Sequence, residues 1–172
     1  VPVVGLWNGT GKTDAASLQK CFDVWLKPDH VAFLKRYERN IVLNPANEWG
    51  GFNDELWVTT YTDGIARLRQ AGVHCLIQVD ASGAFGQNPR SIKQAGQRIL
   101  SADPDKNVMF SLHCYAYHRT APAAGIGSWN DSGAGSPWLT INEINAIKSN
   151  GLAFVVGEIG WEGSAQVGYK TK

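Results

Sequence analysis

The chain of 172 residues carries 16 basic and 15 acidic side chains, which give a formal net charge of +1 and are interspersed along the sequence. This balance provides no electrostatic footprint for nucleic acid and favours an uncharged ligand. Hydrophobic residues make up 44% of the chain and charged residues 18%, as in a single globular domain spanning residues 1–172. No run of about 18 apolar residues occurs, so the sequence predicts no membrane span.

Short apolar runs alternate with segments of helical periodicity, the pattern of βα units that feed a parallel sheet. The expected strands are residues 1–7, 40–45, 74–80, 108–113 and 153–157. The expected helices are residues 15–26, 31–37, 54–71, 91–101 and 140–149. The third helix is the clearest, because apolar residues recur on one face from Trp57 to Leu68 and Gly72 then ends it. The predicted fold class is α/β with a parallel βα repeat.

Polar side chains stand where the expected strands end. The carboxyl ends of parallel strands share one edge of a sheet, and α/β proteins place their ligands there. The residues at or just beyond these ends are Asn8, Asn47, Glu48, Asp80, His113 and Glu158. We therefore expect them to converge on one face. Asp80 is equally consistent with lining this face and with a helix-capping or turn role.

Glu48 and Glu158 place two carboxylates at the ends of separate strands. Cleavage of a glycosidic bond needs one group to protonate the leaving oxygen and another to attack the anomeric carbon. An isolated glutamate at such a position more often caps a helix or meets an arginine. The flanking sequences NIVLNPANEWGG and FVVGEIGW favour the catalytic role over the structural one.

Both segments resemble glycoside hydrolase family 5, in which Asn-Glu ends the fourth strand of an eight-stranded barrel and a Gly-Glu segment ends the seventh. Further matching stretches, in the family's order, are TGKTD, VDASGAFGQ and SADPDKNVMFSLHCYAY. The resemblance covers almost the whole chain and is closest to bacterial mannanase-like members. It implies a truncated TIM-type (β/α)8 barrel that retains about five strands, the third to the seventh.

The resemblance also implies a retaining endo-β-1,4-glycanase that acts on a neutral polysaccharide, mannan or a β-glucan such as cellulose. Glu48 would be the acid/base and Glu158 the nucleophile, with the carboxyls about 5 to 5.5 Å apart. Glu48 must then be protonated while Glu158 is ionised. Asn47 would bond the 2-hydroxyl of the sugar. His113 and Tyr115 match the family's His-x-Tyr, whose tyrosine holds the nucleophile.

Tryptophans that flank strand ends are candidate sugar-stacking platforms, whereas Trp25 and Trp57 are expected in the core. The candidate platforms are Trp7, Trp49, Trp129 and Trp161. Trp7 and Asn8 stand where related mannanases have His-Asp, and both are predicted to contact the substrate.

No cofactor or metal is predicted. His113 and His118 fit no standard zinc spacing, and no cysteine pair completes one. Three cysteines form an odd set without a CxxC spacing, so buried thiols are expected rather than a disulfide framework. They are Cys21, Cys75 and Cys114.

A complete barrel of this type needs about 250 residues. Five strands of it would leave two sheet edges and apolar surface open, so we expect a homo-oligomer that completes or covers the open barrel. Polymer hydrolysis takes place outside cells, so secretion is expected. The alternative function is a non-catalytic carbohydrate-binding or assembly module, because the strands outside the resemblance carry an arginine and a tryptophan of the family's site.

Overall fold

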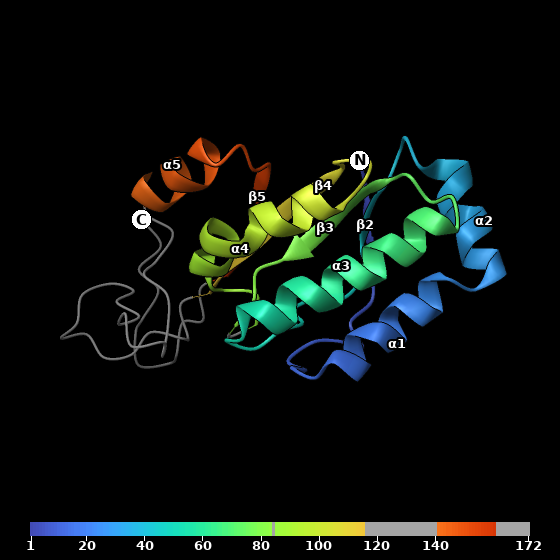
Figure 1. The fold of residues 1–172 in the computed structure, drawn as a ribbon, viewed down its shortest axis with the longest axis horizontal. Coiled ribbons are helices and arrows are strands. Elements are labelled where there is room, and N and C mark those ends of the chain that lie inside the picture. The colour runs from blue at the N-terminus through green and yellow to red at the C-terminus, as the bar shows by residue number, and fades with distance from the viewer. Residues whose placement is uncertain (84, 116–140, 161–172) are drawn as a thin grey trace, which may run out of the picture.

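The computed structural model describes residues 1–83, 85–115 and 141–160, and strands and helices alternate along them (Figure 1). The strands pair in parallel and in chain order from β1 to β5. They are β1 Val3–Gly5, β2 Val42–Asn44, β3 Leu76–Asp80, β4 Val108–Tyr115 and β5 Phe154–Gly160. All five expected strands are confirmed, and β4 and β5 run further than predicted.

Each connection between strands contains at least one helix. The helices are α1 Ala15–Trp25, α2 Pro28–Tyr37, α3 Asp54–Gln70, α4 Pro89–Ala102 and α5 Ile141–Ser149. Helices α2 and α4 begin earlier than the periodicity predicted, because proline is accommodated in the first helical turn, where its missing N–H leaves no bond unmade. Gly72 follows α3 with a φ of 79°, as expected of a residue that stops a helix.

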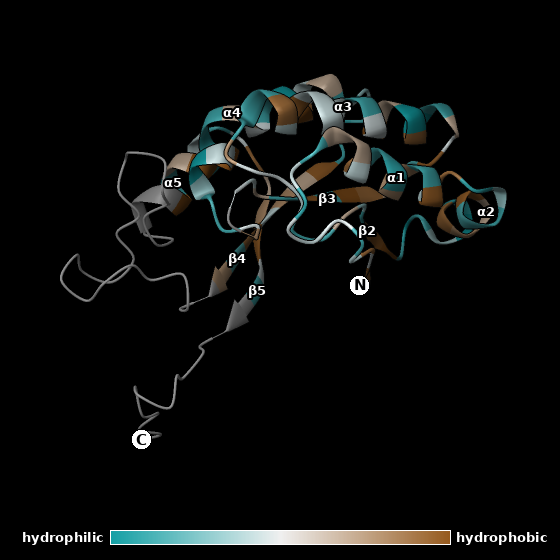
Figure 2. Cartoon of the chain, turned by 90° about the horizontal axis from the view of Figure 1, so that it is seen from below, coloured by the Kyte–Doolittle hydropathy of each residue, from teal (hydrophilic) through white to brown (hydrophobic). Residues whose placement is uncertain are grey.

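The helices lie on one side of the sheet, as Figure 2 shows, and the core fills the space between the two layers. Trp57 and Tyr61 of α3 meet edge to face, and Trp57 also contacts Phe110 of β4. Trp25 and Trp57 are both buried, which confirms their predicted place in the core. None of the described helices is long and apolar enough to cross a membrane.

The other face of the described sheet carries exposed apolar side chains. Val3 of β1 is 50% exposed and Val155 of β5 is 36% exposed on this face. Strands β1 and β5 are the two edges of the described sheet. Helices outside an open parallel sheet are the arrangement of a partial (β/α) barrel, as the sequence predicted.

Candidate active site

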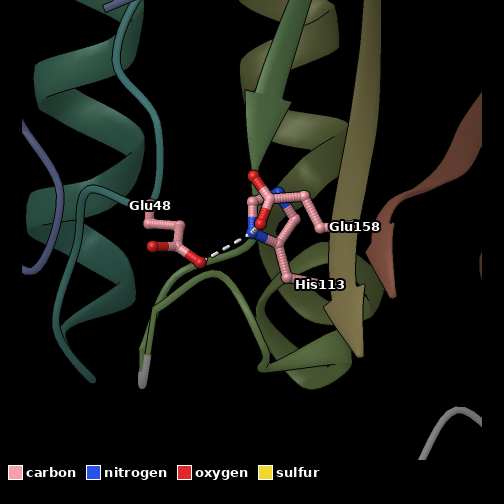
Figure 3. A group of neighbouring side chains, drawn as sticks. All are labelled: Glu48, His113 and Glu158. Carbon is pink, nitrogen blue, oxygen red and sulfur yellow. Dashed lines mark hydrogen bonds and ion pairs between the residues drawn. The ribbon is translucent and has the colours of Figure 1, made fainter. Parts of the chain in front are cut away.

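Three side chains from separate strands meet at the carboxyl edge of the sheet: Glu48, His113 and Glu158 (Figure 3). Glu48 lies in the turn after β2, His113 in β4 and Glu158 in β5. We call them the carboxylate–histidine trio. The sequence predicted this convergence, because parallel strands end at a common edge.

Glu48 is held by its backbone as well as by its side chain. Its φ is 51°, a left-handed conformation that is uncommon for a residue with a side chain. The Glu48 N–H donates to Oδ2 of Asp80 at 2.9 Å, and the Glu48 carbonyl accepts from the N–H of Gly11 at 3.1 Å. The carboxylate turns toward His113, where Oε1 and Nδ1 are joined by a hydrogen bond of 2.9 Å.

Glu158 reaches the same edge because β5 contains an irregularity. Leu112 of β4 pairs with Val156, but the next residue, His113, pairs with Glu158, so Gly157 is an extra residue in the ladder. Such a bulge re-aims the side chain that follows it. A Cβ on Gly157 would collide with the hydroxyl of Ser111, so a larger residue here would force Ser111 to move. The Gly-Glu of the sequence therefore has a geometric reason.

The three side chains of the trio lie close together. His113 Nδ1 lies 2.9 Å from Glu48 Oε1 and 3.6 Å from Glu158 Oε2. One oxygen from each carboxylate and a ring nitrogen of His113 all lie within 4.8 Å of one another. Glu48 and His113 are buried, whereas the side chain of Glu158 is 30% exposed. The arrangement offers two carboxylates in different surroundings around one imidazole.

Three acidic side chains surround the ring of His113. Burial by itself would lower the pKa of His113, but the hydrogen bond with Glu48 and the charges of Asp80, Glu158 and Glu48 raise it above its ordinary value. The surrounding carboxyl groups thus favour the charged imidazole more than water does.

A hollow of about 270 Å³ opens beside the trio on the uncovered face of the sheet. Glu158, His113 and Asn47 line it at the carboxyl edge, and Trp7 forms part of its wall with 65% of its surface exposed. Asn47 is itself buried, and its Nδ2 donates to the Thr10 hydroxyl at 3.1 Å.

The family model named Cellulase (glycosyl hydrolase family 5) matches residues 6–171. The chain belongs to glycoside hydrolase family 5. The match confirms the resemblance drawn from the strand-end motifs. It also accounts for the five parallel strands as part of a TIM-type barrel.

Among curated relatives, the mannan endo-1,4-β-mannosidase of Salipaludibacillus agaradhaerens is 35% identical over 162 residues. That alignment covers 93% of this chain and 46% of the relative. The catalytic domain of a mannanase from Streptomyces sp. SirexAA-E superposes with a TM-score of 0.71 at 27% identity, over 94% of this chain and 47% of that one. The mannohexaose complex of Thermomonospora fusca β-mannanase gives a TM-score of 0.70 at 22% identity, over 92% of this chain and 49% of that one. The chain thus spans about half the length of these proteins.

The structure separates the tryptophans and polar residues that the sequence placed together. Trp49 is 1% exposed, and its Nε1 donates to Ser17 Oγ at 2.9 Å and to the Asp14 carbonyl at 3.1 Å. The prediction of a stacking platform at Trp49 is therefore wrong, because its ring anchors the start of α1. Asn8 lines a different hollow, beside α1, and is not among the residues around Glu158.

Some predicted contacts fall outside what the structure describes. Trp129 and Trp161 lie outside the described residues. Tyr115 ends β4 and pairs with Gly160 of β5, but its side chain is outside the description as well. Their roles stay predictions.

Sequence reasoning left the role of Asp80 open and gave none to Gly157. The side chain of Asp80 is fully buried against Glu48 and His113, and the N-cap of α4 is Asn88 instead. Burial raises the pKa of Asp80 above its ordinary value, although the charge of His113 and the hydrogen bond from Glu48 oppose this. The only sequence signal was an aspartate that ends a buried strand.

Two carboxylates and an imidazole are also donors that a divalent cation accepts. In the trio, however, the Nδ1 of His113 is engaged with Oε1 of Glu48. A cation would have to break this bond, so the arrangement fits proton transfer better than metal binding. The absence of a metal stays a prediction.

Proposed function

We propose that the chain is the catalytic region of a retaining endo-β-1,4-glycanase. Glu48 is the proposed acid/base and Glu158 the proposed nucleophile. The observation that carries the proposal is the approach of one oxygen from each carboxylate to within 4.8 Å around His113. Retaining enzymes hold their carboxyl groups about 5 to 5.5 Å apart, and inverting enzymes about 6.5 to 9.5 Å apart, since a water must fit between. The close approach favours the retaining class.

In the first step of the proposed reaction, the Glu158 carboxylate attacks the anomeric carbon while the Glu48 carboxyl protonates the glycosidic oxygen. The bond from the anomeric carbon to that oxygen breaks, and a glycosyl ester on Glu158 remains. In the second step, Glu48 takes a proton from water as the water oxygen attacks the same carbon and releases Glu158. The partial exposure of Glu158 supports this assignment, because the nucleophile must face the sugar.

We propose a β-mannan as the preferred polymer, with a β-glucan as the second candidate. The names of the curated relatives support mannan, and the T. fusca β-mannanase, a protein of the same fold, forms a complex with mannohexaose. The proposed sugar contacts are the Asn47 amide at the 2-hydroxyl, the His113 and Tyr115 pair beside the nucleophile, and an aromatic wall at Trp7. Trp161 and Asn8 are proposed to contact more distant sugar units.

We also infer self-association and an extracellular site of action. A second copy would cover the exposed Val3 and Val155 and the free sides of β1 and β5. Light scattering on the purified chain is expected to give at least twice the monomer mass, and a monomeric mass at high concentration would refute this. An intact polysaccharide does not enter cells, so the protein is expected in the culture medium rather than in the cell pellet.

The two glutamates are told apart by azide rescue on an aryl β-mannobioside with a good leaving group. In Glu158→Ala, azide is expected to attack the anomeric carbon directly and to give the inverted α-glycosyl azide. In Glu48→Ala, azide is expected to attack the glycosyl ester on Glu158 and to give the retained β-glycosyl azide. Exchange of these two products would reverse the assignment.

Release of reducing ends from mannan, carboxymethyl cellulose and xylan tests the substrate. We expect the highest rate on mannan and loss of at least about 1,000-fold in Glu158→Gln. Glu55→Gln is the matched control, because Glu55 is an exposed carboxylate on α3 whose partner is Arg98. A folded parent protein that binds mannan without cleaving it would instead support the carbohydrate-binding alternative, which the open barrel favours.

A further inference from the structure

Asp80, the last residue of β3, is buried, and among the described residues the polar groups that contact its carboxylate are donors. Oδ1 accepts from Nδ2 of Asn44 at 2.9 Å and from Nε2 of Gln78 at 3.3 Å. Oδ2 accepts from the N–H of Glu48 at 2.9 Å and lies 3.7 Å from Nε2 of His113. An ionised carboxylate is the side chain of this size that offers acceptors alone. These donors therefore suit an ionised carboxylate and oppose the effect of burial, which raises the pKa of Asp80.

The bond from the Glu48 N–H bears on where the Glu48 carboxylate points. A left-handed φ of 51° at a residue with a side chain persists only where the surroundings hold it. The Glu48 N–H is hydrogen-bonded to Asp80, and the Glu48 carbonyl is hydrogen-bonded to the N–H of Gly11. With the backbone fixed in this way, the side chain is directed at His113. An ordinary right-handed or extended φ would aim it elsewhere.

Asp80 also faces the side of His113 that Glu48 does not occupy. Nδ1 of the ring is engaged with Glu48 and lies 3.6 Å from Glu158, whereas Nε2 is directed at Asp80. These three carboxylates are the described titratable groups that act on the imidazole. Asp80 in turn faces His113 and exerts its field on the phenol of Tyr61.

We propose that Asp80 is a positioning residue of this site, whose carboxylate fixes the turn that aims Glu48 and holds the charge of His113. Its consequence for catalysis rests on the proposed function. The positioning of Glu48 and the charging of His113 do not depend on it. The positioning role of Asp80 can therefore be tested separately from its effect on catalysis.

The first test uses the unmodified protein and needs no turnover. Amide hydrogen exchange and proton shifts are measured by NMR for the backbone N–H of Glu48. This N–H is expected to exchange slowly for a turn residue, and its proton to resonate downfield, as for an amide bonded to a carboxylate. Exchange at the rate of open loops would overturn the proposal.

The second test compares Asp80→Asn with Asp103→Asn by titrating the imidazole of His113. Asp103 is a matched control, since it is a buried carboxylate that pairs with Arg69 near the opposite end of β3. In Asp80→Asn we expect the His113 midpoint to fall by about 1 pH unit or more, because a charge close to the ring is lost. In Asp103→Asn it is expected to stay where it is. An unchanged midpoint in folded Asp80→Asn would exclude the role, and if that variant does not fold, the amide measurement still decides.

The third test separates positioning from general damage once hydrolysis is measurable. A dinitrophenyl glycoside needs little protonation of its leaving group, whereas mannan needs the proton from Glu48. Asp80→Asn is expected to lose at least about tenfold more kcat on mannan than on the dinitrophenyl substrate, with KM little changed. Equal losses on both substrates would indicate a structural effect only. If the parent hydrolyses neither substrate, the proposed function fails while the first two tests still judge Asp80.

Discussion

Replacement of Arg69 by methionine is predicted to destabilise the fold strongly. The side chain of Arg69 in α3 is 4% exposed, and its Nε and Nη2 donate to the two carboxylate oxygens of Asp103 at 2.9 and 3.0 Å. Nη1 also donates to the carbonyls of Val73 and Cys75 at 2.8 and 3.1 Å. One guanidinium thus joins α3, the approach to β3 and the turn after α4. Methionine keeps the stem but removes the guanidinium N–H groups that donate to the Asp103 carboxylate and to these carbonyls.

Breaking a buried ion pair by removing one partner costs about 3 to 5 kcal/mol. The backbone N–H groups of Asn107 and Asp105 still donate to Asp103, so we expect a value near the lower end. With a urea slope of about 2 kcal/mol per molar, the unfolding midpoint is expected to fall by about 1.5 to 2 M. Circular dichroism during urea unfolding measures this shift.

Arg98→Met is the matched control. Arg98 likewise donates two N–H groups to one carboxylate, from Nη1 and Nη2 to Glu55, and also lies within a helix. Its side chain is 47% exposed and that of Glu55 is 72% exposed, so water and salt screen the pair. We expect a midpoint shift too small to resolve. Equal shifts in the two variants would refute the reasoning that burial makes the difference.

The destabilisation caused by Arg69→Met is expected to depend on pH, because Asp103 is a titratable partner of Arg69. Burial would raise the pKa of Asp103, but the hydrogen bonds from Arg69 and from the backbone of Asn107 hold it below its ordinary value. A lowered pKa in the folded state stabilises the protein above about pH 4, and this stability is lost as pH falls through the folded-state pKa. The difference in free energy of unfolding between the parent and Arg69→Met is therefore expected to become smaller from pH 7 to pH 3. If this difference stayed constant over the pH range, the charge of Asp103 would not be the cause of the destabilisation.

Two further predictions concern the core. Gly64→Ala is expected to destabilise the protein, because the new Cβ would run into the buried ring of Phe22. Overpacking of this kind costs about 1 to 3 kcal/mol, which outweighs the gain of about 1 kcal/mol in helix propensity. A raised melting temperature would contradict this. Burial raises the pKa of Cys75 to about 11. Iodoacetamide at pH 8 is therefore expected to label this thiol only as the protein unfolds. Rapid labelling of the native protein would show that the Cys75 thiol is accessible and would contradict this.

The sequence predicted the elements and their order because these depend on local patterns. The run from Trp57 to Leu68 repeats at the helical period, and the structure forms α3 over it. The polar residues at strand ends came together because a parallel sheet brings the ends of all strands to one edge. Glu48, His113 and Glu158 meet for this reason, although 110 positions separate the first of them from the last (158 − 48).

What the sequence by itself determined is thus the βα repeat, the family and the edge at which the two carboxylates meet. The tertiary structure decided which way the side chains beyond the strands point. Trp7 and Trp49 both flank strand ends, yet Trp7 is exposed beside Glu158 whereas Trp49 is buried against α1. The physical reason is that a residue past the end of a strand follows no repeat. Its direction depends on backbone turns such as that at Glu48, which are held by partners distant in sequence such as Asp80.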